Sequence, residues 1–472
     1  MTASAPQGPS GPRQSGPEVL VVGAGAAGLV AAWRAAEGGR RVCVVERSPF
    51  VGGMAASVEV AGQRVDLGSH RLHPSIAPHL FDAIQSLLGG DLQLRPRNGR
   101  LRLRDRWIRF PLHAGDLVRQ LPPGLVANTL VDACTRPLRR PKDDTFAEVV
   151  RGRFGRSILD EFYGPYAQKL WGVGAEQLSG ELARRRIATR GAGSLLRRVV
   201  QRGDGPGRTF WYPRRGYGQI VEAVARAAVD AGATIELNAA IRALAPRAGG
   251  VTVVLDDGRT YEAERVLWTA PLTSLADVVD DVPAAVRASV ARLEYRAMVL
   301  AYAVLERPRY TTFDAHYLPN EGTPITRLSE PKNYRDGPDP TDRTVLCAEI
   351  PCRVGDTWWN ASDEALAQAI VDTAALVALP PIEISALEVR RLSRVYPVYT
   401  PDALTAFDDV QRWVATLPNV VTFGRQALFV PDNLHHVMAM GWDAGELASQ
   451  PSWDSAQWAL ANERYATHVV DD

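Results

Sequence analysis

A glycine-rich turn between two apolar runs constrains this chain more than any other stretch. Residues 19–22 are apolar, and Gly23-Ala24-Gly25-Ala26-Ala27-Gly28 follows them directly. An alanine-rich segment from Leu29 to Ala36 leads to a second apolar run, residues 42–45, which ends at Glu46. This order predicts a strand, a tight turn, a helix whose N–H groups face a pyrophosphate, and a second strand whose terminal carboxylate accepts hydrogen bonds from a ribose. The sequence therefore predicts dinucleotide binding at Gly23, Gly25, Ala26, Ala27, Gly28 and Glu46.

Length and composition are those of a globular protein of two or three domains. The chain has 472 residues, of which 46% are hydrophobic and 23% charged. A net charge of +1 implies no nucleic-acid partner. Lys142, Lys169 and Lys332 are the only lysines, so a Schiff-base mechanism has few candidate residues.

The cysteines and the N-terminal residues predict a cytoplasmic protein. Cys43, Cys134, Cys347 and Cys352 form no Cys-x-x-Cys pair, and we expect reduced thiols. Residues 1–17 are rich in Gly, Pro, Ser and Gln, which predicts a disordered tail without the apolar core of a signal peptide. No apolar run reaches the roughly 18 residues that span a bilayer, so no membrane span is expected.

A second glycine pair follows the predicted ribose acid. The sequence Arg47-Ser48-Pro49-Phe50-Val51-Gly52-Gly53-Met54 would bring another loop close to the cofactor phosphates. This arrangement resembles the glutathione-reductase-type FAD fold in its amine oxidase branch. The resemblance implies an FAD cofactor in contact with Arg47, Gly52, Gly53 and Met54.

Two later stretches resemble returning parts of the same FAD domain. Residues 211–271 resemble its second segment, which implies that the adenine lies beside the backbone near Ile241. Residues 416–445 resemble its third segment, which implies cofactor contacts at Gly424, Arg425, Asn433, His435 and Val437. A nicotinamide dehydrogenase needs no such return segment, which favours FAD over NAD.

The predicted fold class is α/β. We expect a glutathione-reductase-type FAD-binding Rossmann domain assembled from separated segments, 18–75, 206–275 and 413–450, with a boundary loop at 203–207. A mixed α+β substrate domain would contain a mainly helical part, 76–205, and a sheet, 276–412. Residues 451–472 would form a C-terminal helix that starts near Ser452 and packs through Trp453, Trp458, Leu460 and Tyr465.

Local patterns predict the elements within these segments. They are a β ribbon at 57–66, a helix at 75–90, strands within 91–111, a helix at 219–231, a strand at 232–238, a hairpin of 251–255 with 259–269, a return strand at 266–271, and two helices, 283–292 and 362–378, among the strands of 276–410.

Four motifs are similar to those of UDP-galactopyranose mutases. They are Gly68-Ser69-His70-Arg71-Leu72-His73, Trp107-Ile108-Arg109-Phe110-Pro111-Leu112, Tyr166-Ala167-Gln168-Lys169-Leu170-Trp171-Gly172, and Gly424-Arg425 followed by Asn433-Leu434-His435-His436. The likeness places Gly68, Ser69 and His70 beside the flavin ring. His435 departs from the pattern, because the mutases have an acid there, and Asp432 or Asp443 could replace it.

Three residues are the predicted catalytic candidates: His70, Arg327 and His435. His70 would hydrogen-bond the flavin or act as an acid or base, the alternative being a loop histidine that binds backbone groups. The His435–His436 pair precedes a helix whose positive end would stabilise reduced flavin, the alternative being a helix cap. We expect no metal site, because no acid or cysteine cluster accompanies that pair in the sequence.

The predicted substrate pocket contains His73, Trp171, Arg327, Tyr396 and Tyr399. Arg327 could hold a phosphate or carboxylate bidentately, although a single arginine in a chain with so many is more often at the surface. Trp171 could equally be a core residue. For Lys169 we expect a salt-bridged helix lysine.

Two enzyme functions, and one non-enzymatic one, stay open at this point. The sequence favours an FAD-dependent oxidoreductase that acts on a small molecule by hydride transfer to flavin N5. The alternative is a mutase-like enzyme that isomerises a nucleotide-activated sugar through reduced flavin without net oxidation. A flavin-binding protein without catalysis is the third possibility, and nothing in the sequence specifies the oligomeric state.

Overall fold

The computed structural model describes residues 16–111, 142–187 and 208–470, with the single residues 120, 124 and 132. Several predictions lie outside the described residues: the tail up to residue 15, much of the helical part between 113 and 205, the boundary loop 203–207, and Cys134. No helix in the described ranges is long and apolar enough to cross a membrane.

A five-stranded parallel sheet carries the glycine-rich turn. Its strands, in the order β19-β13-β1-β2-β9, are β1 (Val19–Val22), β2 (Val42–Val45), β9 (Thr234–Glu236), β13 (Arg265–Trp268) and β19 (Val420–Thr422), all paired in parallel. They come from three stretches far apart in the sequence. The predicted Rossmann-type sheet, assembled from separated segments, is confirmed, whereas the exact domain limits stay a prediction.

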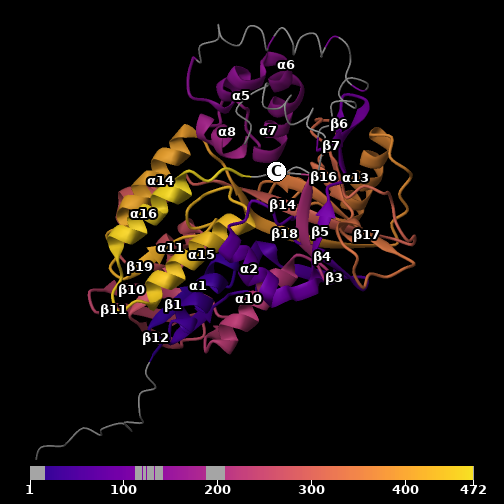
Figure 1. Cartoon of the computed structure of the whole chain (residues 1–472). Helices are drawn as coiled ribbons and strands as arrows, with labels where there is room; N and C mark the ends of the chain where they lie inside the picture. Colours follow the sequence, from indigo (N-terminus) through magenta and orange to yellow (C-terminus); the bar gives the residue numbers. More distant parts are fainter. Residues whose placement is uncertain are drawn as a thin grey trace, which may run out of the picture.

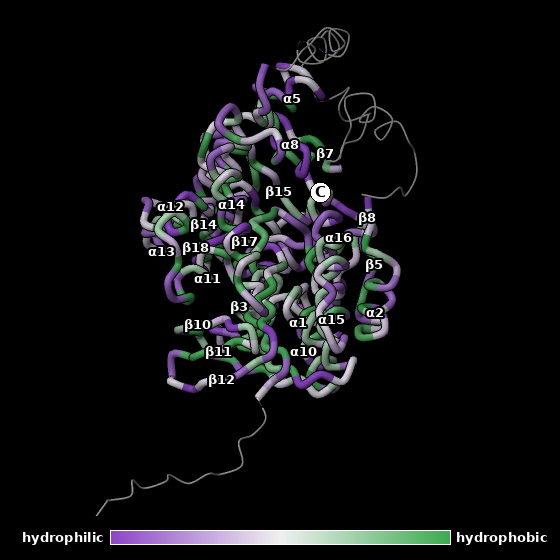
Figure 2. The backbone as a smooth tube through the Cα atoms, turned by 90° about the vertical axis from the view of Figure 1, so that its left-hand side faces the viewer, coloured by the Kyte–Doolittle hydropathy of each residue, from purple (hydrophilic) through white to green (hydrophobic). Residues whose placement is uncertain are grey.

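Five helices form a layer around α1, which contacts β1 and β2 of this sheet. They are α1 (Ala26–Glu37), α2 (Pro78–Leu88), α10 (Gly218–Asp230), α15 (Leu434–Ser449) and α16 (Ser455–Ala466). A Cβ on Gly441 would lie 2.3 Å from the carbonyl oxygen of Ala27, and one on Gly445 would lie 2.6 Å from that of Ala31. The backbones of α1 and α15 therefore nearly touch, and Figure 2 shows the two helices side by side.

The hairpin that follows β9 belongs to a second, antiparallel sheet. Its strands are β10 (Ile241–Arg247), β11 (Gly250–Leu255) and β12 (Thr260–Ala263). The predicted hairpin and the return strand from Val266 are confirmed, but the hairpin partner ends at Ala263, because the chain changes partner at Glu264. Residues before it pair with β11, and β13 after it pairs with β1.

A seven-stranded mixed sheet forms the second large layer, on the right in Figure 1. In the order β18-β14-β17-β16-β15-β6-β7, its strands are β6 (Gly99–Leu103), β7 (Arg106–Phe110), β14 (Tyr295–Leu305), β15 (Ala315–Tyr317), β16 (Arg327–Ser329), β17 (Thr344–Cys352) and β18 (Ala386–Pro397). Two ribbons complete the strands: β3 (Ser57–Val60) with β4 (Gln63–Asp66), and β5 (Leu92–Pro96) with β8 (Thr209–Pro213). The predicted ribbon at 57–66 and strands within 91–111 are confirmed.

Residues 272–414 contain more helices than the two predicted. Besides α12 (Ala284–Val290) and α13 (Asp363–Leu376), the structure has α11 (Leu272–Val278) and α14 (Pro401–Val414). The Thr400 side chain caps α14, and Pro401 occupies its first turn. That cap-and-proline signal was present in the sequence, so the missed helix is an error of interpretation.

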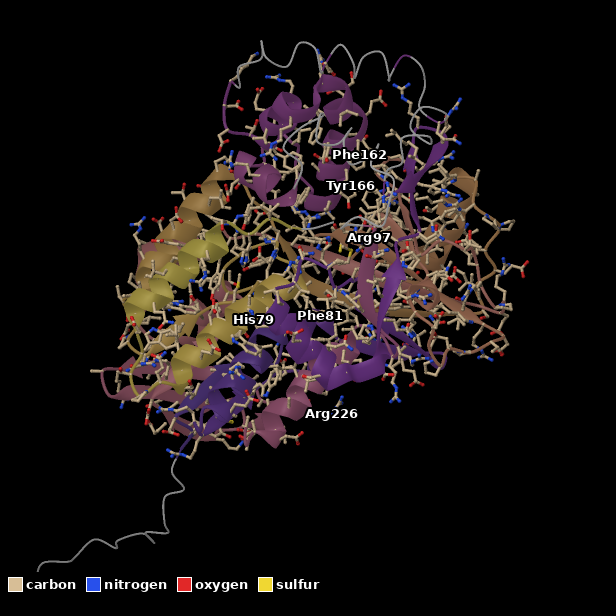
Figure 3. The ribbon with its side chains drawn as sticks, viewed as in Figure 1. His79, Phe81, Arg97, Phe162, Tyr166 and Arg226 are labelled. Atoms are coloured by element: carbon tan, nitrogen blue, oxygen red, sulfur yellow. The ribbon has the colours of Figure 1, made fainter. Side chains whose placement is uncertain are left out.

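A helical region lies at the top of the molecule in Figure 1. It comprises α5 (Phe146–Phe154), α6 (Arg156–Ile158), a π-helical turn (Leu159–Tyr163), α7 (Gly164–Trp171) and α8 (Gly180–Arg186). The rings of Phe162 and Tyr166 stack 5.8 Å apart, and both side chains are labelled in Figure 3. Such π-helical turns occur frequently at functional sites.

The C-terminal helix differs from its prediction at its start and on its face. Asp454 caps α16, which begins at Ser455 rather than near Ser452. Tyr465 is buried, but Leu460 is 58% exposed and does not belong to the packed face. The apolar character of Leu460 predicted a place on the packed face, but its position on the helix faces solvent.

Candidate functional site

The two glycine turns lie directly against each other. The Gly52 N–H donates to the Ala24 carbonyl at 2.7 Å, and Gly25 bridges to Gly52. Gly52 and Gly53 have φ values of +108° and +54°, in the left-handed region that favours glycine. The structure thus brings together the two loops that the sequence predicted to meet at the cofactor phosphates.

The glycines of the first turn differ in how much free space surrounds them. A Cβ on Gly28 would lie 2.1 Å from the Gly23 carbonyl oxygen, whereas a Cβ on Gly25 would meet nothing within 4 Å. Helix α1 starts after Gly25 without a side-chain cap, so its first N–H groups are available to an anion. Gly28 therefore allows the helix to pack closely on the turn. The open space at Gly25 forms a cradle that fits a pyrophosphate.

Glu46 lies at the edge of this cradle. Its carboxylate accepts hydrogen bonds from the backbone N–H groups of Ala24 at 2.9 Å and Ser48 at 2.8 Å. The Glu46 carbonyl also accepts from Ala239, just before Ile241 begins β10. The predicted ribose acid and the predicted adenine segment are thus neighbours.

The returning C-terminal segment joins the same place. A Cβ on Gly424 would lie 3.0 Å from the Ala27 Cβ, and the Gln426 amide lies 3.2 Å from the Met54 sulfur. Arg425 donates to the carbonyls of Val395 and Asp432 at 3.0 Å each. Burial lowers the pKa of Arg425. Arg47, by contrast, is exposed.

His70 is held by stacking rather than by hydrogen bonds. Its ring lies on that of Tyr217, 5.2 Å between centroids and 15° from parallel. Its Nδ1 is buried and has no hydrogen-bond partner among the described residues. Burial lowers the pKa of His70, so the imidazole is neutral near pH 7. The alternative of a loop histidine that binds backbone groups is not supported at Nδ1.

Arg327 is paired with a carboxylate that the sequence analysis did not identify. Its guanidinium donates to both oxygens of Glu349, at 2.9 and 2.8 Å. Glu349 also accepts from the Ser69 N–H at 2.8 Å, so the pair fixes the loop before His70. Burial alone would lower the pKa of Arg327, but the Glu349 carboxylate and the Tyr317 hydroxyl raise it well above its ordinary value.

A second buried arginine, Arg71, is also compensated. It forms an ion pair with Asp314 at 3.2 Å and donates to the Tyr317 hydroxyl at 3.1 Å. Its guanidinium also lies over the rings of Phe210 and Tyr334. Sequence reasoning missed Asp314, Tyr317 and Glu349, because no local pattern links them to the His70 loop.

The loop histidine that meets His435 is His73, not His70. The rings of His73 and His435 are 6.2 Å apart, and Ser75 lies between them, 2.7 Å from His73 Nδ1 and 3.5 Å from His435 Nε2. The ring of His70 stacks instead on that of Tyr217.

An acid does accompany the His435–His436 pair, contrary to the sequence interpretation. Asp432 lies beside His436 and His468. Burial and the neighbouring imidazole of His435 lower the pKa of His436 to about 3. Asp443 is not part of this group and accepts hydrogen bonds from Arg464 and Tyr465.

Three of the predicted pocket residues have contacts that the structure defines. Trp171 is 3% exposed and packs on Phe146, as its core alternative anticipated. Tyr399 is 2% exposed and donates to the Phe429 carbonyl. Tyr396 is half-buried under the Arg425 guanidinium, 5.4 Å from its ring centroid. Tyr396 therefore remains the pocket candidate of the three.

Lys169 binds backbone carbonyls rather than an acid. Its Nζ donates to Leu318, Asn320 and Ile325 at 2.6–3.0 Å. The salt bridge expected from the sequence is replaced by a clamp on the loop between β15 and β16. Burial lowers its pKa to about 7.

Comparison with known proteins decides the family. Residues 26–424 match the model for the flavin containing amine oxidoreductases. The chain belongs to this family.

Relatives of this flavin oxidoreductase agree with the assignment over most of its length. Coproporphyrinogen III oxidase of Propionibacterium freudenreichii subsp. freudenreichii is 24% identical over 449 residues, 83% of each chain. The fold is similar to that of reduced UDP-galactopyranose mutase, with a TM-score of 0.81, 21% identity and coverage of 96% and 99% of the two chains. Cyclohexylamine oxidase from Brevibacterium oxydans IH-35A has a TM-score of 0.66 at 16% identity, with 92% and 99% covered.

The family confirms FAD as the cofactor and the chain as an FAD-dependent oxidoreductase. The residues present fit the group, because the open cradle at Gly25, the uncapped start of α1 and the adjoining Gly52–Gly53 loop are what a dinucleotide pyrophosphate requires.

Proposed function

We propose that this flavoenzyme oxidises a small molecule of low charge, bound beside His70, rather than isomerising a nucleotide sugar. When bound, FAD would supply the redox chemistry by accepting a hydride at flavin N5. The observation that carries the proposal is the pairing of Arg71 and Arg327 near His70, 11% and 18% exposed, with buried carboxylates of their own.

The paired arginines disfavour a diphosphate ligand. Arg327 would have to leave Glu349, and Arg71 would have to leave Asp314, before either could bind a phosphate bidentately. The Asp314 and Glu349 side chains are only 2% and 4% exposed. Breaking a buried pair costs about 3–5 kcal/mol, because it leaves an uncompensated charge in the interior. Near His70 the chain thus presents polarity without net charge.

The neutral histidine gives the site one directed polar group. Tyr217 holds the His70 ring by stacking, and Asp66 holds Tyr217 in turn through its backbone N–H at 2.9 Å. The buried Nδ1 offers one hydrogen bond to whatever lies against it. A neutral imidazole there can orient a ligand without changing its charge.

The second candidate function is the non-redox mutase. The specific observation in its favour is the higher TM-score of the mutase, 0.81 against 0.66 for the amine oxidase, over nearly the whole chain. Against it stands His435, which occupies the place of the mutases' acid, together with the paired arginines.

One experiment separates the two. The purified FAD-loaded protein is mixed anaerobically with cyclohexylamine and further uncharged or singly charged C–H donors, and bleaching of the oxidised flavin band is followed. In parallel, the chemically reduced protein is incubated with UDP-galactopyranose and the sugar ring form is analysed. Bleaching by at least one donor is expected. Isomerisation of the sugar without flavin oxidation would overturn the proposal in favour of the mutase.

A further inference from the structure

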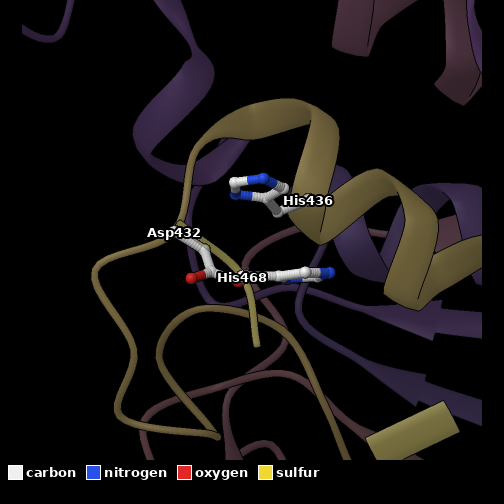
Figure 4. A group of neighbouring side chains, drawn as sticks. All are labelled: Asp432, His436 and His468. Atoms are coloured by element: carbon white, nitrogen blue, oxygen red, sulfur yellow. Dashed lines mark hydrogen bonds and ion pairs between the residues drawn. The ribbon is translucent and has the colours of Figure 1, made fainter. Parts of the chain in front are cut away.

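Three potential metal ligands meet where the last residues of the described chain fold back. Asp432 precedes α15, His436 lies in its first turn, and His468 follows α16. One ligand atom from each lies within 4.8 Å of the other two. Figure 4 shows the two rings and the carboxylate converging on one another.

The carboxylate of Asp432 has an unused oxygen. Its side chain is 0% exposed, and its Oδ2 accepts from His468 Nδ1 at 2.8 Å. Its Oδ1 is buried and has no hydrogen-bond partner among the described residues. Arg425, the nearby cation, donates to the Asp432 backbone carbonyl instead. A buried carboxylate oxygen without a donor is unfavourable, so this oxygen is available to a cation.

Each histidine offers one ring nitrogen to a cation beside that carboxylate, and a cation bound at His468 Nδ1 would replace the proton that this nitrogen donates to Asp432 Oδ2. Their rings stack at 4.3 Å and 17°. The Asn433 N–H donates to His436 Nδ1 at 3.4 Å as part of the capping box of α15, and this cap is kept when His436 binds a cation through Nε2.

We propose that Asp432, His436 and His468 bind a divalent transition-metal cation of the Zn²⁺ class. Two imidazoles and one carboxylate are a donor set that such cations favour, and three protein ligands leave a fourth position for water. In a tetrahedral site with ligand bonds of about 2.0–2.2 Å the ligand atoms lie roughly 3.3–3.6 Å apart, so separations that now lie within 4.8 Å must shorten by up to about 1.5 Å. His468 can supply that movement, because it follows the last helix and its side chain is 18% exposed.

The bound cation would tie the C-terminal segment to the start of α15. The Val470 N–H already donates to the Arg185 carbonyl at 2.6 Å, so the segment also reaches the helical region. This role is independent of the substrate and of the redox reaction proposed above.

The test uses the full-length FAD-loaded protein, treated with chelator and returned to chelator-free buffer. Zn²⁺ is titrated calorimetrically, and bound metal is counted by atomic emission. Co²⁺ is added as a spectroscopic probe, read at wavelengths longer than those at which flavin absorbs. His468→Gln and Asp432→Asn are compared with His79→Gln, a control that alters an exposed histidine on α2 outside the cluster.

One equivalent of Zn²⁺ is expected in the wild type and in His79→Gln. Loss of a direct ligand should weaken binding by more than the roughly 10–100-fold seen for outer-shell partners, in both His468→Gln and Asp432→Asn. If Asp432→Asn does not fold, as judged by circular dichroism and flavin content, His468→Gln decides alone. A wild type that binds no stoichiometric Zn²⁺, or a His468→Gln variant that binds it as tightly, overturns the proposal and leaves a hydrogen bond between Asp432 and His468.

Discussion

The five-stranded parallel sheet and the seven-stranded mixed sheet hold their functional residues by different means. On the parallel sheet, close approach of backbones holds the site together, because α1, α15 and the two glycine turns meet through Gly28, Gly441 and Gly52. On the mixed sheet, ion pairs between charged side chains hold the functional residues in place. Arg327 on β16 and Glu349 on β17 form the pair that positions the Ser69 backbone.

The two regions are therefore sensitive to different kinds of substitution. Close backbone contacts fail when volume is added, because neighbouring atoms cannot move aside. Buried ion pairs fail when one partner is neutralised, because the other is left uncompensated. Four sets of substitutions test this contrast.

Glu349→Gln should be the most damaging single change. It leaves the Arg327 guanidinium buried without a counter-charge, and we expect about 3–5 kcal/mol less stability. Denaturant unfolding measures the loss. Asp144→Asn is the matched control, because its bidentate partner Arg184 is exposed and such pairs contribute about 1 kcal/mol or less. Equal effects for the two variants would refute the role of burial.

Gly28→Val and Gly25→Val should differ, although both add volume to the same turn. The added Cβ at position 28 would lie 2.1 Å from a carbonyl oxygen, so we expect a loss of about 1–3 kcal/mol or more. Position 25 has open space, so that variant should keep the stability of the flavin-free protein and lose FAD affinity. Thermal unfolding of flavin-free protein, with FAD titration, separates the two; identical profiles would contradict the cradle.

His316 on β15 should make the protein less stable in acid. Burial and the charge of Arg100 lower its pKa to about 3, whereas the unfolded residue titrates near 6.5. Between these values the unfolded state binds a proton that the folded state does not, so stability falls as pH decreases from about 6.5 to 3, by up to roughly 1.4 kcal/mol per pH unit. In His316→Gln this contribution to the slope should disappear. His79→Gln, an exposed control, should keep it, and a slope unchanged in His316→Gln would count against this assignment.

Leu460→Ser should have the smallest effect. The side chain is 58% exposed on α16, so the change in stability should stay within about 0.5 kcal/mol. Tyr465→Ser on the same helix removes a buried ring that donates to Asp443, and should cost several times more. A large effect at Leu460 would mean that this face is covered.

Prediction from sequence succeeded where one local segment carries the whole signal. The turn from Gly23 to Gly28, the acid at Glu46 and the pair Gly52–Gly53 lie within a short stretch, and their spacing reflects the geometry of one strand–turn–helix unit. It failed at α14 and at the partner change around Glu264, where competing local patterns looked like strands.

Local sequence patterns could not predict which charged and titratable groups lie around His70 and His435. Ser69 and Glu349 are 280 positions apart in the chain, and Ser75 and His435 are 360 apart. No periodicity connects such residues, because strand order and helix packing bring them together.

The dinucleotide turn could be predicted from the amino-acid sequence, since backbone conformation at glycines and strand–helix periodicity are local properties, whereas the FAD cofactor and the segmented α/β fold were implied by the family resemblance. Only the tertiary structure decided that Arg327 is neutralised by Glu349, that His73 rather than His70 faces His435, and that Asp432 and His468 reach His436. Charge compensation and ligand geometry depend on distances between side chains, which are set only after the two sheets and the C-terminal segment have packed.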